Sequence, residues 1–314
     1  MKILFITANR VGDAVLSTGL LAALIRQYPN ARITIASGPY GADLFRAVPQ
    51  LEHLIILKKR SWNRHWLGLW RECLGTQWDL IVDLRNSIVS RLLRAHKRAY
   101  HKHRSSQHKV IQNGAVLGLQ PPPAPFIWLD ANAEREAAKL LPITRPILAL
   151  GPAANWPVKQ WPIERFLELA QKLTAPDGLW PHAPVMVIGD EKERAQMLLL
   201  LKGIPPERRI EVLGKDLLTV AACLKQAGLF IGNDSGLMHM AAAVGTPTLG
   251  LFGPGYEDIY GPWGNRSAFV RTVESREELL SRLPDAHARE PNLMGGLSVE
   301  RVLEAVKKLL AKTA

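Results

Sequence analysis

Residues 228–254, GLFIGNDSGLMHMAAAVGTPTLGLFGP, decide the fold. An apolar run at 228–234 is followed by an alanine-rich helical pattern from Ser235 and by a second apolar run at 246–254. Short apolar runs are typical of buried strands, and the succession of strand, helix and strand indicates a parallel sheet. This stretch therefore predicts one unit of a parallel α/β fold.

The same alternation extends in both directions. It predicts a second α/β unit before and around this stretch and a first one near the start, with strands at 3–6, 33–37, 54–58, 79–84, 146–152, 184–190 and 210–214. Between the two units, QPPPAP at 120–125 predicts a linker or a peripheral extended strand. We predict domains over 1–140 and 141–295, and an apolar-striped helix over 296–314 that packs on a neighbouring domain surface.

Composition limits the classes of function. The chain of 314 residues carries a formal net charge of +12, which predicts an anionic partner: nucleic acid, an anionic membrane surface or a phosphorylated substrate. Cys73 and Cys223 are too far apart to suggest a disulfide framework or a zinc site, which favours a reducing compartment. No apolar run reaches the length of about 18 residues that a membrane span needs.

The first strand leads into ANRVGDAVL, where Gly12 and Asp13 stand at the turn and the helix start. One interpretation is that Asp13 caps the helix, as Asp does routinely. The other is that its carboxylate is a general base that accepts a proton from an acceptor hydroxyl. A single glycine here does not match the three-glycine dinucleotide fingerprint, which weakens a nicotinamide or flavin interpretation.

The strand at 146–152 leads into GPAANWPVKQWPIERF, where Trp156 and Trp161 flank Lys159. This pattern fits an aromatic-anchored surface loop with a solvated lysine. It equally fits a lysine that neutralises a diphosphate leaving group, since Lys is a point charge on a flexible stem.

The helix that begins near Ser235 supplies a third candidate. Asn233 or Asp234 can cap it, while the backbone N–H groups of Ser235 and Gly236 can bind phosphate at the helix start. Because Asp234 would repel phosphate, its carboxylate suits sugar hydroxyls better. An acid beside an anion site suggests a nucleotide-sugar.

Three motifs carry a family resemblance. GDAVLSTGLLAAL with YPNARITI, then KQWPIERFLELA, then GNDSGLMHMAAAVGTPTLGLFGP together resemble glycosyltransferase family 9, the lipopolysaccharide heptosyltransferases. The resemblance implies a GT-B fold of two Rossmann-like domains that face a central cleft, the first binding the acceptor and the second the donor. It also implies that the C-terminal helix, 296–314, packs back on the first domain. It implies inverting, metal-independent transfer of heptose from ADP-heptose to an inner-core or lipid A acceptor, without a cofactor.

The resemblance also implies residue roles. Asp13 would be the catalytic base, and the donor would be bound by Gly12, Lys159, Asp234, Ser235, Gly236 and His239. Two positions depart from the family pattern: Gly19 stands where proline is frequent and Gly255 where threonine is common. No Asp-x-Asp triplet is present to hold a divalent ion, so lysine and a helix terminus would take over that charge.

A basic segment at 90–109 and a second patch around Lys58, Lys59 and Trp62 predict contact with anionic groups. Since 90–109 holds one aromatic residue, it lacks a stacking platform for nucleic acid, and no nucleic-acid partner is expected. We expect the acceptor, an anionic lipopolysaccharide precursor, to be bound by Arg60, Arg64, Arg98 and Arg104. The predicted location is cytoplasmic, peripheral at the inner membrane.

Two alternatives stay open. The chain could be a GT-B glycosyltransferase that uses another nucleotide-sugar, or a catalytically inactive protein that binds anionic glycans. Ranking ADP, UDP and GDP by the stabilisation they give separates the first from a heptosyltransferase.

Overall fold

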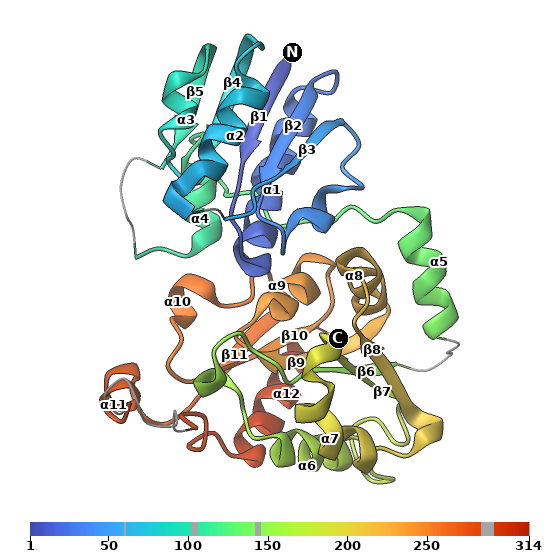
Figure 1. The fold of residues 1–314 in the computed structure, drawn as a ribbon. Helices are drawn as coiled ribbons and strands as arrows, with labels where there is room; N and C mark the ends of the chain where they lie inside the picture. Colours follow the sequence, from blue (N-terminus) through green and yellow to red (C-terminus); the bar gives the residue numbers. More distant parts are fainter. Residues whose placement is uncertain (60, 102–105, 142–145, 284–291, 314) are drawn as a thin grey trace. The chain divides into compact units, whose positions relative to one another are not determined.

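The computed structural model describes residues 1–59, 61–101, 106–141, 146–283 and 292–313. The chain divides into two compact parts, unit 1 (Met1–Asp130) and unit 2 (Ala131–Ala314). Each unit holds one parallel sheet with helices packed on it (Figure 1). The two α/β units expected from the alternation are therefore both present.

Unit 1 is built on a five-stranded sheet in the order β3-β2-β1-β4-β5. The sequential strands β1, β2 and β3 run to one edge, and the order then reverses across β1 to β4 and β5, as in doubly wound folds. The strands are β1 (Lys2–Ile6), β2 (Arg32–Ser37), β3 (Leu51–Ile56), β4 (Trp78–Asp83) and β5 (Ala95–Tyr100), and the helices are α1 (Val11–Gln27), α2 (Arg64–Cys73), α3 (Val89–Leu92) and α4 (Lys109–Ala115).

Helices α2 and α3 cover one face of this sheet. Leu69 and Cys73 of α2 and Val89 of α3 pack in one buried cluster with Leu4 and Ile6 of β1. Alternate residues of β1 point to opposite faces, so Ile3 and Phe5, which are also fully buried, belong to the other face. Both faces of the sheet are covered, as a parallel sheet requires.

The proline segment at 120–125 lies against α1 and α4. A Cβ at Gly19 of α1 would collide with the carbonyl oxygens of Pro123 and Ala124, so glycine allows this segment to approach the helix closely. The backbone N–H of Phe126 also donates to Thr18 Oγ1 at 2.9 Å. The segment is thus packed extended chain within unit 1, and Gly19 has a structural reason to depart from the family's proline.

Unit 2 is built on a six-stranded parallel sheet in the order β11-β10-β9-β6-β7-β8. Its strands are β6 (Ile147–Gly151), β7 (Val185–Gly189), β8 (Arg209–Leu213), β9 (Ala227–Asn233), β10 (Thr248–Phe252) and β11 (Ser267–Arg271). Its helices are α5 (Ala131–Leu140), α6 (Ile163–Thr174), α7 (Leu198–Gly203), α8 (Leu217–Lys225), α9 (Gly236–Ala243), α10 (Glu257–Tyr260), α11 (Arg276–Ser281) and α12 (Val299–Thr313). The order places β9 directly beside β6.

The C-terminal helix α12 packs within unit 2. Val302, Val306 and Leu309 are buried in the main core of unit 2, and α12 packs against α6 and β11. Its predicted packing on the first domain stays a prediction. Its apolar stripe indicated that one face is buried, which is right; the stripe does not specify the partner.

The boundary between the units also differs from the prediction. Helix α5 lies before the predicted boundary at residue 140, yet it belongs to unit 2, where it packs along α8. Ala133 and Ala137 form its buried side, and Glu134 pairs with Lys225 of α8 at 3.5 Å. Small residues on one side let two helices approach closely, which explains the assignment.

Residues 95–100 of the basic segment at 90–109 form strand β5 at the edge of the sheet. Charged side chains on an edge strand discourage pairing with another chain. This explains why residues 95–100 lack the hydrophobic run that is typical of a buried strand. Within the described part of the chain, no helix combines the length and apolarity required to cross a bilayer.

Candidate functional site

Asn233, the last residue of β9, fixes the loop that follows β6. Its side chain is fully buried, its Oδ1 accepts the backbone N–H of Trp161 at 3.0 Å, and its Nδ2 donates to the carbonyl of Pro152 at 2.7 Å. These two bonds hold both ends of the loop 152–161 against the carboxyl end of β9. We expected Asn233 or Asp234 to cap the next helix; Asn233 instead orders the loop that carries Lys159.

Lys159 and Asp234 form an ion pair at this edge of the sheet. Lys159 Nζ lies 2.5 Å from Asp234 Oδ2, and the side chains are 25% and 10% exposed, respectively. Lys159 ends the short 3-10 turn Pro157–Lys159, while Asp234 directly follows β9. Because β6 and β9 are neighbours, their carboxyl ends bring the two residues together. The pair sits where open α/β sheets bind ligands.

The start of α9 lies next to this pair. Ser235 occupies the N-cap position and Gly236 begins the helix, as expected, but the Ser235 side chain makes no capping hydrogen bond. Its hydroxyl oxygen is buried and has no hydrogen-bond partner among the residues that the structure describes. A helix start combines unpaired N–H groups with a positive dipole end, so Ser235 and Gly236 offer a site for an anion.

His239 lies one turn further along α9 and is 5% exposed. With the helical spacing of three residues, it stands on the same side of α9 as Gly236. The position is compatible with the predicted donor contact, which stays a prediction.

Gly255, after β10, adjoins the same carboxylate. A Cβ at this position would lie 2.6 Å from Asp234 Oδ2, well inside van der Waals contact. The glycine thus leaves room for Asp234 to reach Lys159. The departure from threonine at 255 is therefore coupled to the geometry of the ion pair.

Asp13 lies in the first turn of α1, in unit 1, and is half-buried. The N-cap residue is Arg10, whose own side chain makes no capping hydrogen bond. Asp13 is therefore not the N-cap residue, because the helix begins two residues earlier, at Val11. Gly12 likewise belongs to the helix rather than to the turn. A carboxylate in a first helical turn is stabilised in its charged form by the helix dipole.

Arg85 was missed by the sequence analysis. It follows β4, where its guanidinium donates to Asn9 Oδ1 at 2.8 Å and lies over the Trp66 ring at 4.8 Å. The fully buried Asp83 accepts the N–H groups of Arg85 and Ser87, which shapes this loop. Burial lowers the pKa of the Arg85 guanidinium and the Asp83 charge opposes this change, so Arg85 remains a cation.

The Arg85 guanidinium has no carboxylate within ion-pair distance among the described residues. It stands at the carboxyl edge of the unit 1 sheet, where Asn9 follows β1 and Asp83 ends β4. A cation that is partly desolvated and positioned by neutral groups is suited to bind an anion. The sequence feature that could have indicated Arg85 is the polar stretch DLRNS at 83–87, which begins at the end of a buried strand.

The arginines predicted to bind the acceptor differ in placement. Arg98 donates to the carbonyl oxygens of Ser90, Leu93 and Ala95, so its guanidinium stabilises the turn between α3 and β5. This bonding favours a structural role for Arg98. Arg64 begins α2 and is exposed. Arg60 and Arg104 lie outside the described residues.

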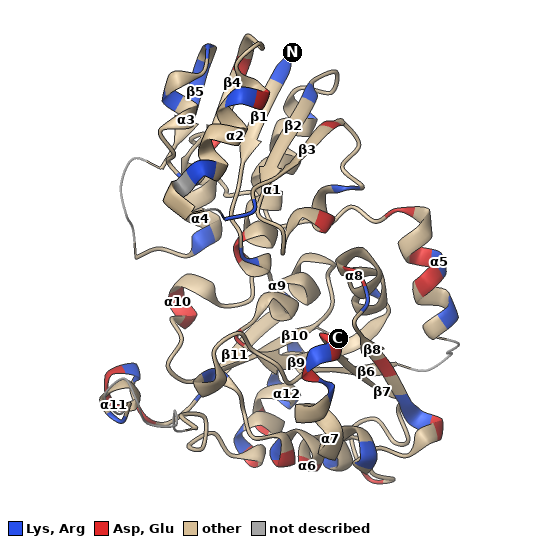
Figure 2. Ribbon diagram, in the orientation of Figure 1, with Lys and Arg blue, Asp and Glu red and all other residues tan. Residues whose placement is uncertain are grey.

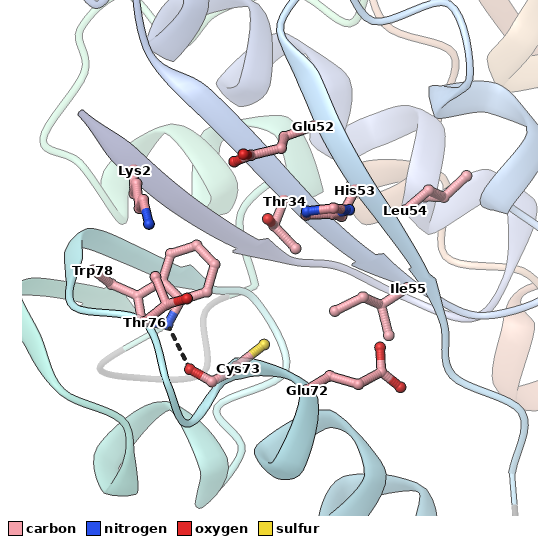
Figure 3. A pocket seen from close by; sticks show the side chains of 10 residues that line it. All are labelled: Lys2, Thr34, Glu52, His53, Leu54, Ile55, Glu72, Cys73, Thr76 and Trp78. Atoms are coloured by element: carbon pink, nitrogen blue, oxygen red, sulfur yellow. Dashed lines mark hydrogen bonds between the residues drawn. The ribbon is translucent and has the colours of Figure 1, made fainter.

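A cavity of about 390 Å³ lies elsewhere in unit 1. Figure 3 shows its lining, which includes Lys2, Glu52, His53 and Glu72, and the bond from Trp78 Nε1 to the Cys73 carbonyl at 3.2 Å. Lys2 and Trp78 are the first residues of β1 and β4. The cavity is thus near the amino ends of these strands and contains none of the predicted site residues.

No cluster of three or more His, Cys, Asp or Glu side chains suited to a metal ion occurs within the described ranges.

Comparison with known proteins gives a consistent result. The model of the family described as glycosyltransferase family 9 (heptosyltransferase) matches residues 93–282. Lipooligosaccharide heptosyltransferase 2 of Haemophilus influenzae is 24% identical over 355 residues, covering 99% of this chain and all of that protein.

Solved structures are similar over the whole chain. A glycosyltransferase family 9 structure from Veillonella parvula has a TM-score of 0.80 at 20% identity, covering 99% of this chain and 97% of that one. The Escherichia coli heptosyltransferase WaaC, solved with ADP, has a TM-score of 0.75 at 17% identity, covering 98% and 100%. These similarities confirm the predicted GT-B fold class.

Proposed function

The chain belongs to glycosyltransferase family 9, and from that premise we propose that it transfers heptose from ADP-heptose to the inner core or lipid A region of a lipopolysaccharide precursor. The observation that carries this proposal is the Lys159–Asp234 pair beside the start of α9. It joins a cation, a carboxylate and a helix N-terminus. The cation and the helix N-terminus suit the diphosphate of a nucleoside diphosphate sugar, and the carboxylate suits the sugar hydroxyls. Curated relatives that match nearly the whole chain are named heptosyltransferases.

In this proposal unit 2 binds the donor. The ammonium of Lys159 and the N–H groups at Ser235 and Gly236 receive the diphosphate, and their positive charge stabilises ADP as it leaves. Asp234 accepts hydrogen bonds from heptose hydroxyls. We propose that these groups suffice without a metal ion, so transfer is expected to continue in the presence of a chelator.

Unit 1 supplies the acceptor side. Asp13 takes the proton from the attacking hydroxyl of the acceptor, whose oxygen forms the new bond to the anomeric carbon of heptose while the bond from that carbon to the diphosphate breaks. A single displacement of this kind inverts the anomeric configuration. We add Arg85 as an anchor for an acidic group of the acceptor, since it is a positioned cation without a carboxylate partner among the described residues.

We further propose that the protein acts at the cytoplasmic face of the inner membrane and contacts it peripherally. The formal charge supports an anionic partner on one unit: residues 1–130 hold 18 Lys and Arg against 7 Asp and Glu, whereas residues 131–314 hold 22 against 21. Unit 1, the proposed acceptor side, therefore carries almost all of the excess positive charge.

The test is release of ADP from ADP-heptose in the presence of a Kdo–lipid A acceptor. The native protein is expected to turn over, Asp13→Asn to lose at least a hundredfold in rate, and Asp43→Asn, an exposed acid elsewhere in unit 1, to keep it. If UDP or GDP stabilises the protein against heat and ADP does not, another nucleotide-sugar is the donor. Binding of ADP-heptose and acceptor without any transfer would favour the inactive binding protein.

A further inference from the structure

Helix α2 presents two different sides. His65, Leu69 and Cys73 are buried in unit 1. Arg64, Leu67, Arg71 and Leu74 are exposed, and their spacing of three and four residues places them along one stripe on the opposite side. Leu67 and Leu74 remain 44% and 43% exposed. The outward stripe therefore alternates arginine with leucine.

Trp62 lies two residues before the start of helix α2. Its side chain is 94% exposed, and its backbone has φ 54° and ψ 27° in the left-handed region that bulky residues rarely adopt. An exposed tryptophan in an unfavourable backbone conformation contributes no favourable free energy to the fold of the chain alone. A second surface that receives the indole ring would account for both features.

The neighbouring helix α3 also carries exposed apolar residues. It packs beside α2 over the same core cluster, and Ile88 and Leu92 at its two ends are 59% and 61% exposed. Arg91, between them, is also exposed. We call the exposed residues of this region the α2–α3 surface: Trp62, Arg64, Leu67, Arg71, Leu74, Ile88, Arg91 and Leu92.

The charge around this surface is strongly one-sided. Residues 58–109 contain 13 Lys and Arg against 3 Asp and Glu. Figure 2 shows basic residues on α2, on β5 and at the start of α4. Of the three acids, Asp83 is fully buried, so it adds little to the outer face.

We propose that the α2–α3 surface docks on an anionic lipid bilayer. This inference rests on the proposed function and deepens it, because it names the surface that makes the peripheral membrane contact proposed above. Trp62, Leu67 and Ile88 would enter the boundary between headgroups and acyl chains, while arginine stems lie along them and the guanidinium groups stay at the phosphates. Leucine and isoleucine offer no stacking face to bases, which disfavours nucleic acid as the occupant.

The experiment is cosedimentation of the full chain with vesicles of phosphatidylcholine alone and of phosphatidylcholine with one quarter phosphatidylglycerol. The native protein is expected to partition at least tenfold more strongly to the anionic vesicles and to be released by high salt. Both Trp62→Ala/Leu67→Gln and Arg64→Glu/Arg71→Glu are expected to weaken that partition at least tenfold. Lys307→Glu/Arg301→Glu on exposed positions of α12, which changes the net charge equally, is expected to keep it.

Three results would overturn the proposal: no preference of the native protein for anionic vesicles, native-like binding by both α2 variants, or equal loss in the α12 control. Loss of poly(U) binding in the α2 variants without loss of vesicle binding would assign the surface to nucleic acid instead. Circular dichroism and urea unfolding, measured on each variant, report whether both units are still folded. Because the vesicles contain no acceptor, failure here leaves the proposed transferase activity standing, and failure of that activity leaves vesicle binding standing.

Discussion

Lys159 Nζ lies 2.5 Å from Asp234 Oδ2, although 75 positions separate the two residues in the chain. The strand order places the ends of β6 and β9 side by side, and Asn233 then fixes the loop that carries the lysine. The pair is thus a product of the fold rather than of a local motif. Its charges are matched before any ligand arrives, so a bound diphosphate has to compete with Asp234 for Lys159.

The first prediction concerns Asn233. Asn233→Ala removes the partners of the Trp161 N–H and the Pro152 carbonyl, which are then buried without hydrogen bonds. At about 1–3 kcal/mol for each unsatisfied group, we expect the free energy of unfolding to fall by about 3 kcal/mol. Urea unfolding measures this, with the exposed Asn132→Ala as a control that changes stability by less than about 0.5 kcal/mol. Equal effects of the two variants would show that the two hydrogen bonds of the Asn233 side chain do not stabilise the protein.

The second prediction concerns Gly255. Gly255→Ala places a Cβ 2.6 Å from Asp234 Oδ2, so the carboxylate or the loop has to move and the contact with Lys159 is disturbed. We expect the affinity for ADP-heptose to fall about tenfold, measured by calorimetry. Gly295→Ala is the matched control, because nothing lies within 4 Å of a Cβ there. Unchanged affinity of Gly255→Ala would mean that the exact position of Asp234 does not matter.

The third prediction concerns α12. Val306 is fully buried in the core of unit 2, so Val306→Ala removes two carbons from a packed site. At about 0.8 kcal/mol per carbon plus a cavity term, the loss of stability is expected to be about 2 kcal/mol. The exposed neighbour Lys307→Ala serves as the control in thermal or urea unfolding. A loss as small as in that control would contradict the packing of α12 within unit 2.

The fourth prediction concerns the two cysteines. Burial raises the pKa of Cys73 and of Cys223 to about 12, so almost no thiolate is present at pH 8. The native protein is expected to react negligibly with a thiol-exchange reagent, and the protein in guanidinium chloride to react at both cysteines. Rapid stoichiometric reaction of the native chain would contradict the burial of these side chains.

The sequence predicted the fold where the signal is apolar. Strands expected at 33–37, 79–84 and 228–234 occur as Arg32–Ser37, Trp78–Asp83 and Ala227–Asn233, because buried parallel strands are continuous hydrophobic runs. Strand β5 was missed since an edge strand needs no such run. The apolar stripe of α12 predicted correctly that one face of the helix is buried, but periodicity does not specify which elements cover that face.

The sequence predicted which residues belong to the candidate site better than it predicted what each of them does. Lys159 and Asp234 follow apolar strands, which singled them out, but their direct pairing depends on the strand order. Of the two interpretations of Asp13, that of an N-cap residue does not hold, because helix α1 begins before it. Arg98 and Arg85 look alike in the sequence, yet one binds three backbone carbonyls and the other lies over Trp66. Only tertiary contacts separate these two arginines.

The most direct test of the donor site is the dissociation constant of ADP for Lys159→Met and Asp234→Asn, measured by calorimetry. Lys159→Met removes the cation and leaves a carboxylate facing the diphosphate, so ADP binding is expected to weaken at least tenfold, or about 1.4 kcal/mol. Asp234→Asn keeps the size of the side chain and releases Lys159, so ADP is expected to bind as tightly as before or more tightly. The extra affinity for ADP-heptose over ADP is expected to disappear. Equal weakening of ADP binding by both variants would contradict this division of roles and reduce the pair to a structural ion pair.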